Sequence, residues 1–160
     1  MQYAGRIDSK RKGSKSRRAR AAAGGKAPAG KGRLRVVIAD DDPIALDEIG
    51  GLLETRFDVV GRAGNGRELV KAVRKLSPAV VVADMAMPEM NGIEAARHIT
   101  NTYPNIKVVI LSVHSDPAFV DAAFEAGASG YVLKLRASKE LIPAIEDILA
   151  GRPYYPPGSR

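Results

Sequence analysis

The chain has 160 residues, 45% of them hydrophobic, which is enough for one domain of ordinary size with its own core. It has no cysteine, which excludes disulfides and thiolate metal sites and favours a cytoplasmic location. No apolar run approaches the roughly 18 residues that a membrane span needs, and the N-terminus lacks the apolar core of a secretory signal. We therefore expect a protein that makes no contact with the membrane.

Positive charge is concentrated at the N-terminus. Residues 1–33 hold 11 of the 25 Lys and Arg residues and a single acid, Asp8, whereas residues 34–160 carry 14 basic and 17 acidic groups. The segment is otherwise rich in Gly, Ala and Ser, so we predict a disordered basic arm over 1–33. Such an arm can make weak contacts with nucleic-acid phosphates. The absence of aromatic residues between positions 9 and 33 favours two simpler interpretations, a solvated tail or a wrongly assigned translation start.

From Leu34 onward, short apolar runs alternate with helical patterns. The apolar runs predict five strands, at residues 34–39, 58–61, 79–83, 107–111 and 130–133. A helical pattern follows each run. The first helix is capped by Asp42, and the second has apolar positions 69, 72, 73 and 76. The other three are predicted at 93–102, 116–127 and 138–149, the last capped by Ser138. Strands this apolar must be buried on both faces. The pattern predicts one α/β domain over 34–150, with a parallel sheet between helices, and a C-terminal tail over 151–160.

Polar residues stand where these strands end. Asp40 and Asp41 follow the first strand, Asp84 the third, Ser112 the fourth and Lys134 the fifth. Ligands of an open α/β sheet bind beyond the carboxyl ends of its strands, where the strand order reverses. If the order is 2-1-3-4-5, the three acids converge. Their mutual repulsion is relieved by a hard divalent cation, and Mg²⁺ suits carboxylate oxygens. Together with the ammonium and the hydroxyl, they form a pocket for a phosphoryl group, with Asp84 as nucleophile.

Simpler interpretations exist for each residue taken alone. Asp42 is explained as a helix cap, but capping needs one acid and leaves the two preceding acids unexplained. Asp84 could be a turn residue before Pro88 and Asn91-Gly92. Ser112 and Lys134, taken singly, suit a cap and a solvated charge. Their joint placement at one sheet edge favours the phosphoryl site.

Together these residues resemble the receiver domain of two-component response regulators, in particular the receivers of LuxR/NarL/FixJ-type regulators. The matching motifs are Asp40-Asp41, "DMAMPEMNG" from Asp84, Ser112, and Tyr131 with Lys134 in "GYVLK". The resemblance covers residues 34–150. It implies a doubly wound, five-stranded parallel sheet of order 2-1-3-4-5, the flavodoxin-like arrangement, with helices on both faces.

The same resemblance implies roles for individual residues. Asp84 would accept a phosphoryl group from a sensor histidine kinase or a phosphotransfer protein. Asp40, Asp41 and Asp84 would hold Mg²⁺ together with the backbone carbonyl of Ala86.

Lys134 and Ser112 would contact the phosphoryl group. Ser112 and Tyr131 would form a switch pair, in which the hydroxyl moves toward the phosphoryl oxygen and the ring turns inward. The change would spread over the fourth helix, fifth strand and fifth helix. The chain would act as a signalling receiver rather than an enzyme, catalysing only its own phosphoryl transfer and autodephosphorylation.

Two departures from the family pattern and two alternatives accompany this interpretation. Leu135-Arg136 follows Lys134 where the family often has Pro, which makes the aim of the lysine less certain. We expect the helix-turn-helix output domain of the branch to be missing, and the signal to pass through a homodimer, a downstream output protein or the basic arm. The alternative is a nucleic-acid-binding protein that acts through the arm. An aspartyl phosphatase would usually carry a second acid where this chain has Ala86.

Overall fold

The computed structural model describes residues 32–159. Most of the predicted basic arm, residues 1–31, lies outside the described residues, so its predicted disorder and its contact with nucleic acid stay predictions. No helix within the described residues is long and apolar enough to cross a membrane.

The described chain alternates strands and helices from one end to the other. The elements in chain order are β1 (Arg35–Ala39), α2 (Pro43–Leu53), β2 (Asp58–Ala63), α3 (Gly66–Leu76), β3 (Val80–Asp84), α4 (Gly92–Thr102), β4 (Lys107–Ser112), α5 (Pro117–Glu125), β5 (Gly130–Leu133), the 3₁₀ helix η3 (Lys134–Arg136) and α6 (Ala137–Leu149). All five strands are parallel, in the order β2-β1-β3-β4-β5. The predicted fold class and strand order are confirmed.

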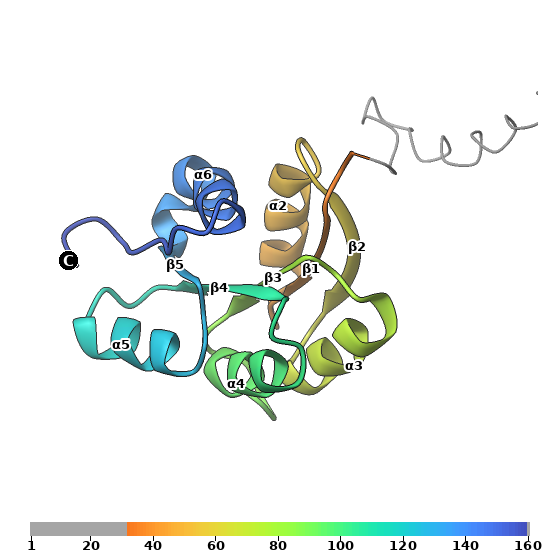
Figure 1. Cartoon of the computed structure of the whole chain (residues 1–160), viewed down its shortest axis with the longest axis horizontal. Coiled ribbons are helices and arrows are strands. Elements are labelled where there is room, and N and C mark those ends of the chain that lie inside the picture. Colours follow the sequence, from red (N-terminus) through yellow and green to blue (C-terminus); the bar gives the residue numbers. More distant parts are fainter. Residues whose placement is uncertain (1–31, 160) are drawn as a thin grey trace, which may run out of the picture. The chain divides into compact units, whose positions relative to one another are not determined.

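Helices cover both faces of the sheet (Figure 1). On one face, α3, α4 and α5 pack over one set of strand residues, such as Val37, Val81 and Ile110. On the other face, α2 and α6 pack over the alternate set, such as Val36 and Val82. This alternation follows from the two-residue period of a strand, which sends successive side chains to opposite faces. The Val and Ile residues of each strand therefore contribute alternately to the hydrophobic cores on the two faces of the sheet.

Side-chain caps fix where most helices begin, just beyond the carboxyl ends of the strands. Asp42, Asn65, Asn91 and Asp116 each accept a backbone N–H of the helix that follows. The predicted cap at Ser138 is wrong. The 3₁₀ turn η3 runs directly into α6, which begins at Ala137, so Ser138 already lies within the first turn of the helix.

Candidate functional site

Three carboxylates meet where β1 and β3 end. Asp40 and Asp41 directly follow β1, and Asp84 is the last residue of β3, its neighbour in the sheet. One oxygen from each carboxylate lies within 4.8 Å of the others. Asp40 and Asp84 are buried, whereas Asp41 is exposed. The structure thus brings together the three acids that the sequence placed at one sheet edge.

Lys134 reaches the same cluster from the end of β5. Its Nζ lies 2.8 Å from Asp40 Oδ2 and 2.9 Å from Asp84 Oδ1. The residue after it is Leu135 rather than Pro, and the peptide bonds of the described residues are all trans. Lys134, the first residue of η3, thus contacts both buried carboxylates although no proline follows it.

Burial and charge perturb the ionisation of this cluster. Burial raises the pKa of Asp84; the hydrogen bond from Lys134 opposes that rise, and the charges of Asp40 and Asp41 add to it. Burial lowers the pKa of Lys134, but its hydrogen bonds to Asp40 and Asp84 outweigh burial and leave that pKa raised. The lysine is therefore an ammonium at neutral pH. One positive charge faces three acids, which leaves this group suited to a further cation.

Backbone contacts hold Asp40 and Asp42 in separate roles. Asp40 Oδ1 accepts the Asp42 N–H at 2.9 Å, which fixes the buried carboxylate beside Lys134. Asp42 Oδ1 accepts the Ile44 N–H at 3.0 Å and so caps α2. The third acid of the Asp-Asp-Asp run is a helix cap, as the sequence indicated.

The loop between β3 and α4 is anchored close to Asp84. The Gly92 N–H donates to the Met85 carbonyl at 2.9 Å, and the Gly66 N–H donates to the Met90 carbonyl at 3.0 Å. A Cβ at Gly92 would collide with the backbone carbonyl of Asp84. The Asn91-Gly92 pair therefore does more than make a turn, since the glycine lets α4 begin directly against the end of β3.

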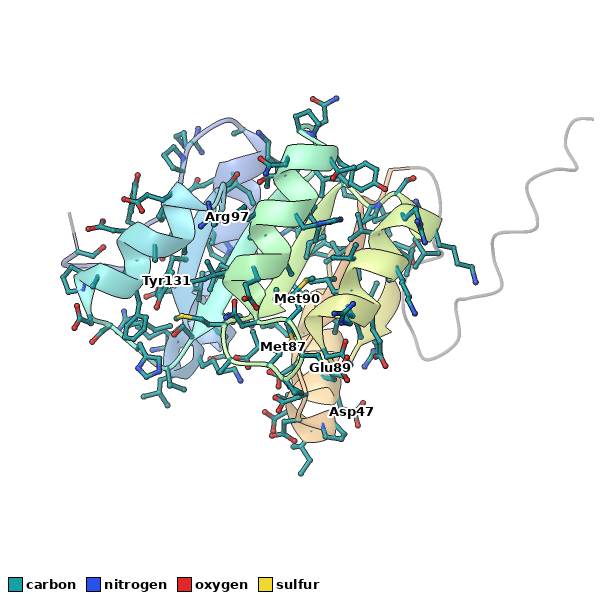
Figure 2. All side chains as sticks on the ribbon, turned by 90° about the horizontal axis from the view of Figure 1, so that it is seen from below. Asp47, Met87, Glu89, Met90, Arg97 and Tyr131 are labelled. Atoms are coloured by element: carbon teal, nitrogen blue, oxygen red, sulfur yellow. The ribbon has the colours of Figure 1, made fainter. Side chains whose placement is uncertain are left out.

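Ser112 and Tyr131 are connected through the backbone of His114. The Ser112 hydroxyl oxygen accepts the His114 N–H at 2.9 Å, and the Tyr131 hydroxyl donates to the His114 carbonyl at 2.7 Å. Burial raises the pKa of Tyr131, so its phenol is a neutral donor at physiological pH. The ring is fully buried, between α4 and α5 (Figure 2). Ser112 and Tyr131 thus contact the backbone of the same residue, His114, from two strands.

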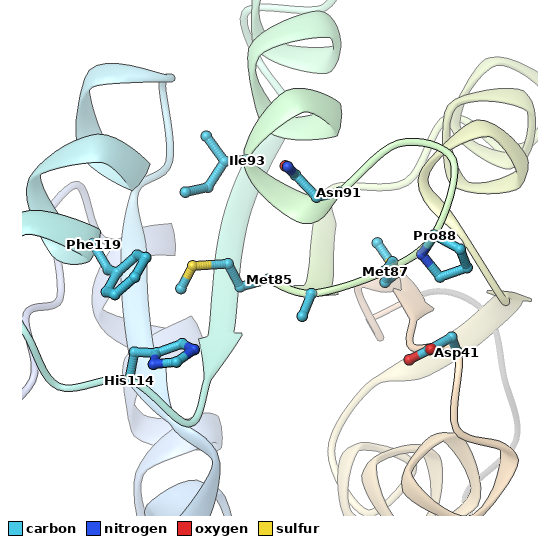
Figure 3. Close-up of a pocket in the computed structure, with 9 residues that line it drawn as sticks. Asp41, Met85, Met87, Pro88, Asn91, Ile93, His114 and Phe119 are labelled. Carbon is cyan, nitrogen blue, oxygen red and sulfur yellow. The ribbon is translucent and has the colours of Figure 1, made fainter.

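A pocket of about 580 Å³ opens beside the carboxylates. Figure 3 shows Asp41 on one side of it and His114 with Phe119 on the other. Those two rings stack, with centroids 4.6 Å apart. Ala86 lines the pocket, next to Met85. Met85 and Phe119 line this pocket but were not predicted as site residues. Both are apolar, and nothing in the sequence distinguishes them from residues of the core.

A parallel 2-1-3-4-5 sheet with acids and a lysine at its switch point defines a doubly wound domain of the flavodoxin-like class. The model of the response regulator receiver domain family matches residues 36–146. The chain belongs to this family, whose members signal in two-component systems, and the predicted resemblance is confirmed.

Relatives of known structure agree in fold. The chain is 40% identical to a two-component response regulator of the LuxR family from Aurantimonas, with a TM-score of 0.73 over 76% of this chain and 89% of that one. It is 30% identical to the isolated receiver domain of RcsB from Salmonella enterica serovar Typhimurium, solved with the phosphomimetic BeF₃⁻, with a TM-score of 0.72 over 79% of this chain and 95% of that one.

Curated relatives include full-length regulators. The chain is 35% identical over 127 residues to the transcriptional regulatory protein DegU of Brevibacillus brevis, and 36% identical over 126 residues to the response regulator GacA of Pseudomonas viridiflava. These matches cover 78% of this chain in both cases, and 54% and 59% of the two relatives. The chain thus spans little more than half the length of these regulators.

Proposed function

We propose that the chain is a phosphorylation-dependent switch in which Asp84 accepts a phosphoryl group from a sensor histidine kinase or a phosphotransfer protein in the cytoplasm. The observation that carries this proposal is the double contact of Lys134 with Asp84 and Asp40, next to the exposed carboxylate of Asp41. A half-buried lysine paired with two buried carboxylates counts against a purely structural turn at Asp84, because the ammonium lies where the oxygens of a transferred group need a positive charge.

The proposed chemistry is transfer to a carboxylate. An oxygen of Asp84 attacks phosphorus, the new O–P bond forms, and the N–P bond of the donor phosphohistidine breaks, so the electron pair stays on the imidazole. Lys134 pairs with the phosphoryl oxygens as it now pairs with Asp84 Oδ1. The pocket beside Asp41 and Ala86 offers the approach for the donor side chain.

The acidic cluster fits Mg²⁺. Carboxylate oxygens are its preferred protein ligands, and three of them lie within 4.8 Å of one another here. Asp40, Asp41 and Asp84 would hold the ion, with the backbone carbonyl of Ala86 as a further ligand. When bound, the ion supplies positive charge that offsets the negative charge of the transferring phosphoryl group.

The switch is proposed to run through Ser112 and Tyr131. When the Ser112 hydroxyl turns to a phosphoryl oxygen on Asp84, the His114 N–H loses its acceptor and the loop after β4 moves. Tyr131 holds the backbone of the same residue, since its hydroxyl donates to the His114 carbonyl. Its ring already occupies an inward position, so the core accommodates the arrangement that the switch requires. The face formed by α5, β5 and α6 then changes its shape for a downstream protein or a second copy.

The test is labelling by acetyl phosphate with Mg²⁺, read as a shift on a phosphate-affinity gel. The wild-type chain should shift, and Asp84→Asn should not. Asp42→Asn is the matched control, since it alters a neighbouring acid and retains a good helix cap. Labelling that survives in Asp84→Asn would show that another residue is the acceptor and would overturn the proposal.

A further inference from the structure

The segment that follows α6 returns to the edge of the sheet. The Tyr154 N–H donates to the Ser129 carbonyl at 3.0 Å, and the Tyr131 N–H donates to the Tyr154 carbonyl at 2.9 Å. Gly130 and Tyr154 thereby form a parallel bridge, and the chain is seen passing beside β5 in Figure 1. We call residues Arg152–Tyr155 the C-terminal strap. It closes part of the β5 edge, which would otherwise present unpaired backbone groups.

The two tyrosines of the strap lie on opposite sides of the sheet, as successive strand residues do. Tyr155 stacks on Phe124 of α5, with ring centroids 4.3 Å apart. Tyr154 packs against the core under α6. There, burial and then the buried Glu140 carboxylate raise the pKa of Tyr154 to about 12. The strap therefore contacts all three elements of the proposed switch face.

Tyr131 connects the strap to the site. Its hydroxyl donates to the His114 carbonyl, while the His114 N–H donates to Ser112. The backbone N–H of Tyr131 is at the same time bonded to the strap, at Tyr154. On the side of the sheet where its ring lies, Phe124 and Tyr155 pack against the same core cluster. Tyr131 thus contacts the His114 loop through its side chain and the strap through its backbone N–H.

We propose that the strap reports the position of Tyr131: it is seated on β5 while the ring lies inside the core, and it loosens when the ring leaves. An outward turn breaks the hydrogen bond to the His114 carbonyl and removes the ring from the cluster that Phe124 and Tyr155 cover. It also disturbs the main chain of β5, to which the strap is bonded. The residues after Gly151 are then part of the signalling face rather than a passive tail.

Coupling of this kind is reciprocal, because two events that favour one state favour each other equally. This inference rests on the proposed function, which assigns the inward ring to the phosphorylated form. Phosphorylation of Asp84 then tightens the strap, and a seated strap strengthens the binding of a phosphoryl group. Coupling between sites in proteins amounts to about fivefold or more in affinity.

The first test measures amide hydrogen exchange by NMR in the whole chain, with and without Mg²⁺ and beryllofluoride as the phosphoryl analogue. The amides of Tyr131 and Tyr154 should exchange about fivefold more slowly with the analogue. The Asp58 amide is the control, since it is bonded to the Leu34 carbonyl at the opposite edge of the sheet and should change less. Equal changes at both edges, or none at the strap, would overturn the inference.

The second test compares variants of the strap by their affinity for beryllofluoride. Tyr155→Ala removes the stack on Phe124 and should weaken binding about fivefold. Lys71→Ala is the control, because Lys71 is exposed on α3 and lies outside both the strap and the proposed switch face. Unchanged affinity in Tyr155→Ala would overturn the inference and leave the proposed function intact. A wild-type chain that does not bind the analogue at Asp84 would overturn both.

Discussion

Lys134 Nζ and Asp84 Oδ1 lie 2.9 Å apart. Asp84 ends β3 and Lys134 follows β5, and β4 lies between these two strands in the sheet. Lys134 is the first residue of η3 and directly follows β5, and its side chain reaches Asp84 at the end of β3. The contact also includes Asp40, so a single ammonium balances two buried carboxylates. Removal of this cation should therefore affect phosphoryl transfer and the ionisation of both acids at once.

We expect Lys134→Ala to slow labelling by acetyl phosphate about 10- to 100-fold, since hydrogen bonds to charged groups contribute about 1.5–3 kcal/mol. The measurement is the initial rate of labelling at saturating Mg²⁺. Lys139→Ala is the control, because Lys139 is an exposed lysine on α6. If both variants label at the wild-type rate, Lys134 does not contact the transferred group.

Mg²⁺ should stabilise the folded chain through the acidic cluster. Binding to the folded state alone adds about 2.7 kcal/mol to the free energy of unfolding at an ion concentration 100 times the dissociation constant. Thermal unfolding in Mg²⁺ and in EDTA should differ for the wild-type chain and for Asp42→Asn. The difference should disappear in Asp41→Asn, which removes the exposed ligand of the cluster. A gain that persists in Asp41→Asn would place the ion elsewhere.

In the absence of Mg²⁺, Asp84→Asn should be more stable than the wild-type chain at neutral pH, by on the order of 1 kcal/mol, a typical size for a single substitution. Burial raises the pKa of Asp84, so the folded state holds this proton more tightly than the unfolded chain does. Stability of the wild type therefore falls, relative to the variant, as pH rises from the ordinary value of 3.8 through the raised pKa.

Urea unfolding as a function of pH, in EDTA, checks this expectation. The difference from this cause should vanish well below pH 3.8, where the carboxyl group is protonated in both states. A wild-type chain that becomes more stable than Asp84→Asn as pH rises would contradict it.

Two glycines make a matched pair. Gly92→Ala should lower the free energy of unfolding by about 1–3 kcal/mol, because the new methyl group collides with the Asp84 carbonyl and forces backbone shifts. Gly51→Ala, on the exposed side of α2 with nothing near its Cβ position, should be neutral or stabilising by about 0.5–1 kcal/mol. Urea unfolding measures both. Equal effects of the two substitutions would mean that the β3–α4 loop moves to accommodate the new methyl group at position 92 at no cost in stability.

The fold and the gathering of the acids were predictable because both depend on rules that act locally. Apolar runs such as 79–83 predict buried strands, and the carboxyl ends of parallel strands lie at the same edge of the sheet. The strand order itself came from the resemblance. The Ser138 cap failed because a 3₁₀ turn has no sequence pattern that separates it from the helix it leads into.

The strap was beyond sequence reasoning for another reason. Its pairing with β5 is made by the backbone of Tyr154, and backbone hydrogen bonds leave no signature in residue type. Residues 151–160 were predicted as a tail because they follow the last predicted helix. The inward position of Tyr131 depends in the same way on the loop backbone at His114, since it is the carbonyl there that accepts the phenol.

Of the three clustered carboxylates, Asp41 is the exposed one, while Asp40 and Asp84 are buried. A cation held by this group can therefore arrive and depart on the Asp41 side without any opening of the core. The exchange of Mg²⁺ there would be limited by the loss and regain of the ion's own water, which Mg²⁺ gives up reluctantly, and would need no movement of the rest of the domain.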